Sequence, residues 1–343
     1  MKIGMAYDLK EDVALSAGQP EDALEEYDCL ETVQAIATAL EFLGHVVVML
    51  GGGKDFLINI LQNNVDFVFN IAEGRGKYRS REAQVPAILE MLNMPYSGAD
   101  PQCLTICLDK PLTKKLVAEA SILTPAWQVI SDIKELKGIV WDSFPFPAFV
   151  KPAYEGSSKG IRFSSRVESP KEIPGAVETV LEKYGQPAML EEFIPGDEVT
   201  VGIVGTPPQI LGIMRVLPRQ GCDPNFIYSL EVKREWEKLV SYECPARLPP
   251  KTMQDIAEAS LKAFKVLGCR DVARIDFRVD TQRKPYLLEV NPLPGLRPGY
   301  SDLPIMAQEM GYEYKTVIGL ILNSALRRQN LPCLGFRIYL TYA

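Results

Sequence analysis

The stretch Arg274-Ile275-Asp276-Phe277 is followed along the chain by Glu289-Val290-Asn291-Pro292, and this pair decides the fold. Each stretch is typical of a short strand, on which residues two apart point to the same face. The arginine therefore shares a face with the aspartate, and the glutamate shares one with the asparagine. Two adjacent strands of this kind would gather oxygen ligands that suit Mg²⁺. The alternative is a surface ladder of polar cross-strand pairs, and an arginine aligned with three oxygen donors favours the metal site.

A second informative stretch is KPAYEGSSKG, residues 151–160, which follows an apolar strand. A lysine at a strand end can reach over phosphates, and the glycines of the turn let backbone N–H groups approach oxyanions. By itself such a turn could simply connect two strands.

A third stretch, MLEEFIPGDE at residues 189–198, alternates apolar and acidic residues. Its backbone could run beside an adenine base, with Glu198 placed for the ribose hydroxyls. Taken alone, the pattern is also that of an ordinary strand-turn-strand unit.

In this order the three stretches match the ATP-grasp pattern, in which ATP is held between two α+β lobes without a Walker loop. Over nearly all of residues 1–328 the chain resembles the D-alanine–D-alanine ligase family. The fold expected from the resemblance is an α/β and α+β ATP-grasp fold with an N-terminal parallel-sheet domain. The cofactors that it implies are ATP and Mg²⁺ or Mn²⁺.

The resemblance also assigns the nucleotide and metal residues. Two lysines, Lys110 and Lys151, match those that contact the phosphates. The residues that match the nucleotide-binding segment are Glu191, Glu192, Ile194 and Glu198, the last at the ribose. The residues that match the magnesium ligands are Asp276, Glu289 and Asn291.

Further matches concern catalysis and the amino-acid substrates. Ser157 matches the serine of the glycine-rich turn, and Lys233 matches the lysine of the mobile loop over the site. The Gly295 amide matches the group that forms an oxyanion hole with Arg274. Ser301 matches a serine near the carboxylate of the second substrate.

The chain departs from the family's pattern at the substrate end. The opening strand leads into a polar loop without the family's glycine-serine turn and glutamate, so an acid near Glu25, Glu26 or Asp28 would take that place, with Glu26 as our candidate. The family's His-Gly is Glu73-Gly74, and the tyrosine after the lid lysine is Arg234. Two alternative explanations fit these departures. One is drift within a clade that uses the same substrates, and the other is a changed first or second substrate. A bidentate arginine would suit an extra carboxylate.

The implied reaction has two steps. A carboxylate attacks the γ-phosphoryl group of ATP to give an acyl phosphate, and the amine of a second amino acid then displaces phosphate. D-Alanine is the leading substrate, which would place the chain in peptidoglycan synthesis for the cell wall. The competing hypothesis is a nucleotide-binding protein that kept the fold and lost catalysis. The intact metal set weighs against it.

The remaining sequence indicates three lobes. Alternating strand and helix patterns in residues 1–104 predict a mostly parallel sheet covered by helices. Residues 105–188 and 189–330 form the two ATP-grasp lobes, with a lid loop at 221–244, and residues 331–343 form a tail without an assigned function. Gly51-Gly52-Gly53-Lys54 lacks GxxxxGK[ST], so we interpret it as a turn. His45, the single histidine, opens an apolar strand and is expected to be structural.

Composition restricts the partners and the compartment. The 343 residues carry a net charge of −7, and 47% of them are apolar. The acidic balance argues against nucleic acid or an anionic membrane as partner. Seven scattered cysteines without a CxxC pair indicate reduced thiols, and the N-terminus lacks a signal-peptide pattern. We expect a cytoplasmic protein acting on small amino acids, with a homodimer as an assembly to test.

Overall fold

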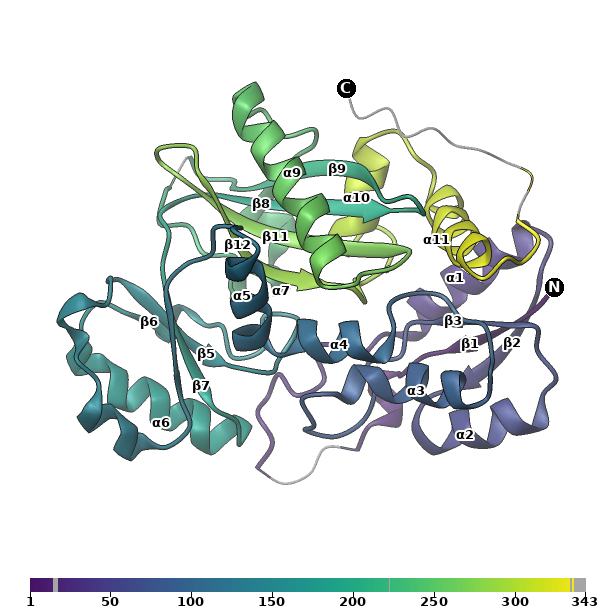
Figure 1. Cartoon of the computed structure of the whole chain (residues 1–343), viewed down its shortest axis with the longest axis horizontal. Coiled ribbons are helices and arrows are strands. Elements are labelled where there is room, and N and C mark those ends of the chain that lie inside the picture. The colour runs from purple at the N-terminus through teal and green to yellow at the C-terminus, as the bar shows by residue number, and fades with distance from the viewer. Residues whose placement is uncertain (15–17, 222, 334, 336–343) are drawn as a thin grey trace.

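The computed structural model describes residues 1–14, 18–221, 223–333 and 335. These residues form three sheets, each covered by helices (Figure 1). Most of the tail expected at 331–343 lies outside the described residues. Among the described residues, no helix is both long enough and apolar enough to span a bilayer.

The first sheet is parallel, with strand order β2-β1-β3. Its strands are β1 (Lys2–Ala6), β2 (Val46–Gly51) and β3 (Phe67–Asn70). Its helices are α1 (Leu30–Phe42), α2 (Gly53–Gln62) and α3 (Gln84–Met91). Apolar residues of α1 and the C-terminal helix α11 (Tyr314–Arg328) pack on one face, and those of α2 and α3 pack on the other. The predicted parallel sheet with two helical layers is confirmed.

The glycine run that resembles a phosphate loop is a tightly packed turn between β2 and α2. A Cβ on Gly52 would lie 1.9 Å from Asp8 Oδ1, and Gly51 and Gly53 have positive φ angles of 70° and 55°. Only glycine adopts this backbone at no steric cost. The glycines are therefore accounted for by packing, as the turn interpretation expects.

The central sheet is antiparallel, with strand order β4-β7-β5-β6. Its strands are β4 (Trp127–Ile130), β5 (Ala148–Pro152), β6 (Arg166–Val167) and β7 (Ala188–Glu192). Helix α6 (Ile173–Tyr184) covers one face with the buried side chains of Val177 and Val180. Because β7 pairs with β4 and β5, we propose that the second lobe ends after Glu192 and not at residue 188.

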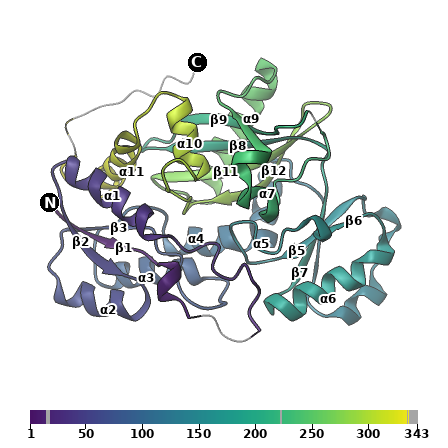
Figure 2. The ribbon, with the colours of Figure 1, turned by 180° about the vertical axis from the view of Figure 1, so that it is seen from behind.

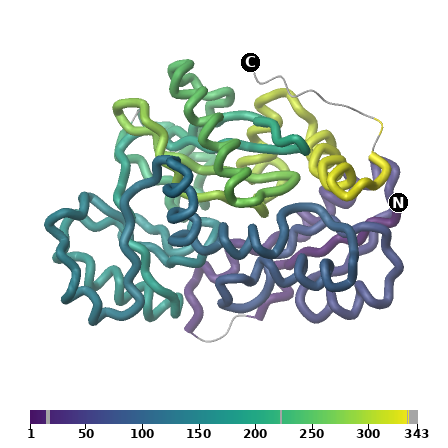
Figure 3. Tube along the Cα trace, in the orientation of Figure 1, coloured from purple at the N-terminus to yellow at the C-terminus, as the bar shows by residue number. Residues whose placement is uncertain are grey.

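The third sheet is antiparallel, with strand order β10-β9-β8-β11-β12. Its strands are β8 (Gly196–Val204), β9 (Gln209–Pro218), β10 (Val240–Glu243), β11 (Val272–Asp280) and β12 (Pro285–Asn291). Its helices are α4 (Pro101–Leu108), α5 (Lys110–Glu119), α9 (Pro250–Val266) and α10 (Asp302–Glu309). Figure 2, seen from behind, shows α10 and α11 beside this sheet, and the tube of Figure 3 traces the path between the lobes.

Two expected segments are built differently from the sequence prediction. The sequence pattern of residues 108–119 predicts one helix, but the structure interrupts it at Asp109, because this side chain accepts a hydrogen bond from the Leu112 amide (3.0 Å) and caps a new helix. The lid segment, expected as a loop, contains α7 (Leu230–Arg234), α8 (Trp236–Leu239) and strand β10.

The cysteines of the described residues are free thiols, in agreement with the sequence prediction. Cys103 and Cys107, four residues apart, share a face of α4, and their sulfurs lie 4.0 Å apart. Cys269 joins them at 3.7 Å from Cys103, and all three are buried in the core under the third sheet.

Candidate functional site

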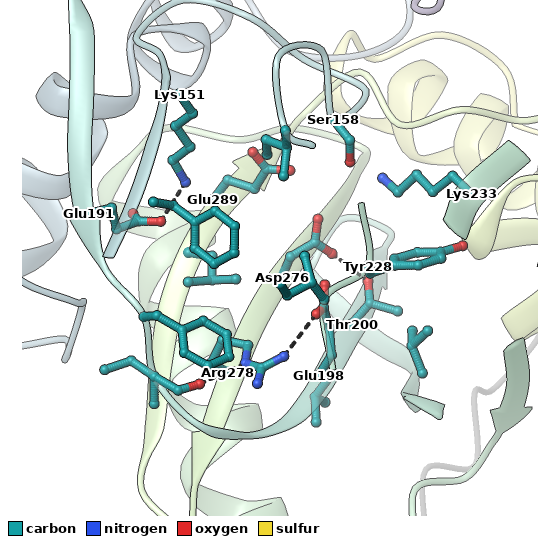
Figure 4. Close-up of a pocket in the computed structure, with 18 of the residues that line it drawn as sticks. Lys151, Ser158, Glu191, Glu198, Thr200, Tyr228, Lys233, Asp276, Arg278 and Glu289 are labelled. Carbon is teal, nitrogen blue, oxygen red and sulfur yellow. Dashed lines mark hydrogen bonds and ion pairs between the residues drawn. The ribbon is translucent and has the colours of Figure 1, made fainter. Parts of the chain in front are cut away.

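A cleft separates the central sheet from the third sheet and gathers most of the predicted residues (Figure 4). One wall comes from β5 and β7, and the other comes from β8, β11 and β12. The predicted residues that line it are Lys151, Glu191, Glu192, Ile194, Glu198, Lys233, Arg274, Asp276 and Glu289.

The carboxylates of Asp276 and Glu289 meet because β11 and β12 pair in register, with Asp276 opposite Glu289 and Arg274 opposite Asn291. Asp276 accepts hydrogen bonds from Arg274 (2.8 Å), from Asn291 (3.1 Å) and from Thr200 (2.6 Å). The hard oxygen atoms of this set suit magnesium. The residues present therefore fit a divalent ion, and their charge is balanced here by neighbouring cations.

Two buried lysines face these carboxylates. Lys110 Nζ lies 2.9 Å from Glu289 and donates to the Glu155 carbonyl at 2.6 Å. Although burial opposes ionisation, Lys110 and Lys151 hold the pKa of Glu289 below its usual range. Lys151 Nζ lies 2.5 Å from Glu191, toward which it points in Figure 4. The structure thus places both predicted lysines where they can contact anionic oxygens of a ligand.

Glu191 has a second cationic partner that the sequence prediction missed. Lys114 Nζ, fully buried, lies 2.7 Å from Glu191. Burial lowers the pKa of Lys114 to about 8, against the opposing effect of Glu191. Lys114 sits one helical turn after Lys110 on α5, so helical spacing placed both ammonium groups on one face.

The predicted ribose-binding residue, Glu198, is held by a buried arginine. Arg278 lies 3.1 Å from Glu198 and donates to the carbonyl oxygens of Ile194 (2.9 Å) and Phe226 (2.8 Å). One guanidinium therefore ties the nucleotide-side strand to the base of the lid. Arg278 follows Arg274 and Asp276 at two-residue steps on β11, so strand alternation could have identified it.

The lid is closed over the cleft by ion pairs with the first and central lobes. Arg234 contacts Glu25 at 2.5 Å, and Arg162 lies 3.7 Å from Glu231 on the same short helix. Lys233 points into the cleft and lies 4.9 Å from the centre of the Tyr228 ring (Figure 4). Arg234 is thus engaged with a protein carboxylate in this arrangement, while Lys233 faces the ligand space.

A second chamber opens from the cleft toward the first lobe. Its predicted residues are Glu26, Ser157, Lys233, Arg234, Arg274, Asn291, Gly295 and Ser301. A Cβ on Gly295 would lie 2.8 Å from Ser301 Oγ, so the glycine lets the loop and the serine approach closely. Ser301 Oγ also accepts a hydrogen bond from the Arg297 amide at 3.1 Å.

Glu26, the acid predicted to contact a substrate, is already paired with cations of the protein. Its buried carboxylate pairs with Arg81 (2.5 Å) and with Lys159 (3.2 Å), so both oxygens have internal partners. Burial raises the pKa of the nearby Asp28 to about 7. Burial and the neighbouring carboxylates also raise the pKa of Glu73 well above its usual range. Asp28 and Glu73 are the acids of this wall whose charge is least compensated.

The basic residues that follow Glu73 have structural partners. Arg75 lies 2.9 Å from Asp8. Arg81, which is 1% exposed, joins Glu26 to Glu155 of the central lobe. The sequence shows that these residues are cationic, but it does not show which carboxylates of the protein they pair with.

The chain is similar over most of its length to one family of known proteins. A family model described as D-ala D-ala ligase C-terminus matches residues 116–323. The D-alanine–D-alanine ligase of Aquifex aeolicus is 35% identical over 294 residues, covering 86% of this chain and 94% of the relative. A crystal structure of D-alanine–D-alanine ligase from Bacillus anthracis complexed with ATP has a TM-score of 0.73 at 25% identity, covering 96% and 99% of the chains. The VanG D-Ala:D-Ser ligase of Enterococcus faecalis shares the fold, with a TM-score of 0.70 at 21% identity over 94% and 99%.

Proposed function

Because this chain belongs to the D-alanine–D-alanine ligase family of ATP-dependent ligases, we propose that it joins two amino acids, with D-alanine as the leading donor and acceptor. The product would be a dipeptide formed through an acyl phosphate. The observation that carries this proposal is the pairing of β11 with β12, which sets Asp276 opposite Glu289 and Arg274 opposite Asn291, with Lys110 2.9 Å from Glu289 and Lys151 lining the cleft beside them.

The proposed first step brings two anions together, a carboxylate and the γ-phosphoryl group, so positive charge must already be in place. Lys110 and Lys151 supply it from the central lobe, where both are buried and are held by Glu289 and Glu191. A magnesium ion held by Asp276, Glu289 and Asn291 would add charge that offsets the phosphate oxygens.

In the proposed second step, negative charge develops on the carbonyl oxygen of the acyl phosphate. Arg274 and the Gly295 amide line the chamber where this oxygen would sit. Removal of one such donor typically slows a reaction by about 10²–10³. Burial opposes the charge of Arg274, but Asp276 and Asp302 raise its pKa further, so it stays cationic throughout.

The lid helices support the proposal because acyl phosphates hydrolyse in water. The ion pair between Arg234 and Glu25 closes the chamber at 2.5 Å, and Lys233 projects inside it. We propose that release of this pair admits the substrates. Since Arg234 holds the lid, the departure at this position supports a closing role more than a contact with an extra substrate carboxylate.

We propose that the ammonium group of the first amino acid binds beside Asp28 and Glu73. Glu26, the candidate from the sequence, is neutralised by Arg81 and Lys159. A bound ammonium would offset the mutual repulsion that raises the pKa of Glu73.

A catalytically silent nucleotide-binding protein is the competing function. Silent relatives would have no need to keep Lys110, Arg274 and the metal ligands in mutual contact, and here these contacts are intact. Action in the cytoplasm, a role in peptidoglycan synthesis and a homodimer remain proposals from the family resemblance.

The test is ADP release coupled to a spectroscopic readout, with ATP, Mg²⁺ and a panel of D- and L-amino acids that includes D-alanine and D-serine. Release that requires D-alanine supports the proposal, and release with another amino acid alone changes the substrate but keeps the ligase. Tight ATP binding with no release for any amino acid would establish the silent protein instead.

A further inference from the structure

Four side chains line both the nucleotide-side cleft and the chamber beyond it, and so mark the place where the two spaces meet. They are Tyr228, Lys233, Arg274 and Asp302. Two are cations and one is a phenol, so Asp302 is the single carboxylate among these shared residues.

Asp302 lies next to the group that would stabilise the reacting carbonyl. Its Oδ2 is 3.5 Å from Arg274 Nη1, whereas Arg274 binds Asp276 at 2.8 Å. Tyr228 also hydrogen-bonds to this carboxylate, and the long distance to Arg274 leaves it able to accept a stronger cationic partner. A carbonyl bound to Arg274 would therefore lie within reach of both Asp302 and a nucleophile held by it.

The other carboxylates nearby are already engaged. Asp276 and Glu289 belong to the metal set, and Glu198 pairs with Arg278 at 3.1 Å. Across the chamber, Glu25 pairs with Arg234 at 2.5 Å. Asp302 is thus the carboxylate at the junction with capacity for a substrate group.

Charge at the junction requires such an anion if an ammonium group is to enter. Arg274 and Lys233 both carry positive charge there, and each would repel the amine of the second substrate in its resting, protonated form. The Asp302 side chain is only 11% exposed, so its attraction for a cation is weakly screened by water.

We propose that Asp302 binds the ammonium group of the acceptor amino acid and accepts its proton, acting as the general base of the amide-forming step. This role rests on the proposed ligase function. Burial raises the pKa of Asp302, which brings it closer to that of the proton it must accept.

One N–H bond of the acceptor ammonium breaks, and its proton passes to a carboxylate oxygen of Asp302. The freed nitrogen lone pair forms a C–N bond with the acyl phosphate carbon. The C–O bond to phosphate then breaks, phosphate leaves with its electron pair, and the nitrogen loses a second proton to the departing phosphate to give the neutral amide.

The experiment compares two acceptors on the full chain and on the Asp302→Asn variant. Hydroxylamine is largely unprotonated at neutral pH, so it attacks an acyl phosphate without needing a base. With an amino-acid acceptor, the variant should lose about 10²–10⁴ in kcat/KM, the usual contribution of a general base. Hydroxamate formation from the same donor should stay within about threefold of wild type, because it requires only the first step.

Glu309→Gln, an exposed change on the same helix, is the matched control and should leave both rates unchanged. Asp302→Glu, which keeps a carboxylate, should retain more amide formation than Asp302→Asn. If Asp302→Asn does not fold by circular dichroism, Asp302→Ser takes its place in the same comparison.

Parallel loss of both products in the variant would mean that Asp302 acts only by holding Arg274, and would overturn the general-base role. Unchanged amide formation would overturn it as well. If the wild-type chain releases no ADP with any amino acid or with hydroxylamine, the ligase function itself fails. The assays of the unmodified chain therefore separate the two failures.

Discussion

Arg81→Met removes the central cation of a buried network that joins the first lobe to the central lobe. Arg81 is 1% exposed and contacts Glu26 at 2.5 Å, Glu155 at 3.2 Å and the Tyr154 carbonyl at 3.0 Å. Lys159 completes the network at 2.5 Å from Glu155. The four side chains together are electrically neutral, with two cations and two anions.

Methionine fills much of the space of arginine but leaves two buried anions facing one lysine. Breaking a buried ion pair from one side typically costs about 3–5 kcal/mol. We expect the free energy of unfolding to fall by that amount, because Lys159 can neutralise only one of Glu26 and Glu155. Adding Glu26→Gln restores neutrality, so the double variant should lose only about 1–3 kcal/mol.

The assay is urea unfolding followed by circular dichroism and tryptophan fluorescence on wild type, both single variants and the double variant. A coupling energy of at least about 1.5 kcal/mol between Arg81 and Glu26 is expected. Losses that simply add, or an Arg81→Met loss below about 1 kcal/mol, would refute the reasoning and show that water reaches the network. If Glu26 instead bound a substrate ammonium, Glu26→Gln would raise KM for the donor with little change in stability.

Three further outcomes are expected. Asp276→Asn and Glu289→Gln should each lower ADP release by more than about 10² while retaining the native circular dichroism spectrum, since each removes a charged oxygen ligand; retained turnover would disprove the metal set. Asp28→Asn should stabilise the ligand-free chain much more at pH 8 than at pH 4 in thermal melts, because a pKa raised from 3.8 to about 7 means that stability is lost progressively as pH rises from about 4 to about 7; the gain is at most about 4 kcal/mol, and equal shifts at both pH values would contradict it. Gly74→Ala should cost more than about 3 kcal/mol in urea unfolding, because φ is 79° and the new Cβ would lie 2.0 Å from the Arg81 carbonyl oxygen; a loss below about 1 kcal/mol would show that the loop can shift.

Much of the fold followed from local patterns. Apolar runs and helical spacing predicted the parallel first sheet, and two-residue alternation predicted that Arg274 and Asp276 share a face. Alternation could also have identified Arg278. Prediction was weaker where a polar side chain ends an element, as at Asp109, and within the lid, where short helices carry too few residues for a periodic pattern.

The candidate site was predictable where its residues are close neighbours in the sequence. The metal set and the lysine of the glycine-rich turn lie in short stretches whose residue types indicate oxygen ligands and phosphate contacts. The pairing of β11 with β12 was needed only to bring these stretches into register.

By itself, the sequence determined the fold class and the family and predicted the nucleotide-side residues, because strand alternation and local motifs depend on neighbours along the chain. Only the tertiary structure decided which charges are free to act. Glu26 and Arg234 are ordinary polar residues in the sequence, yet each is paired with a residue far along the chain. Asp302, next to the predicted Ser301, lies 3.5 Å from Arg274, so its negative charge is only partly neutralised by that arginine. Burial and ion pairing set the pKa and availability of a side chain, and both depend on segments that meet only when the chain folds.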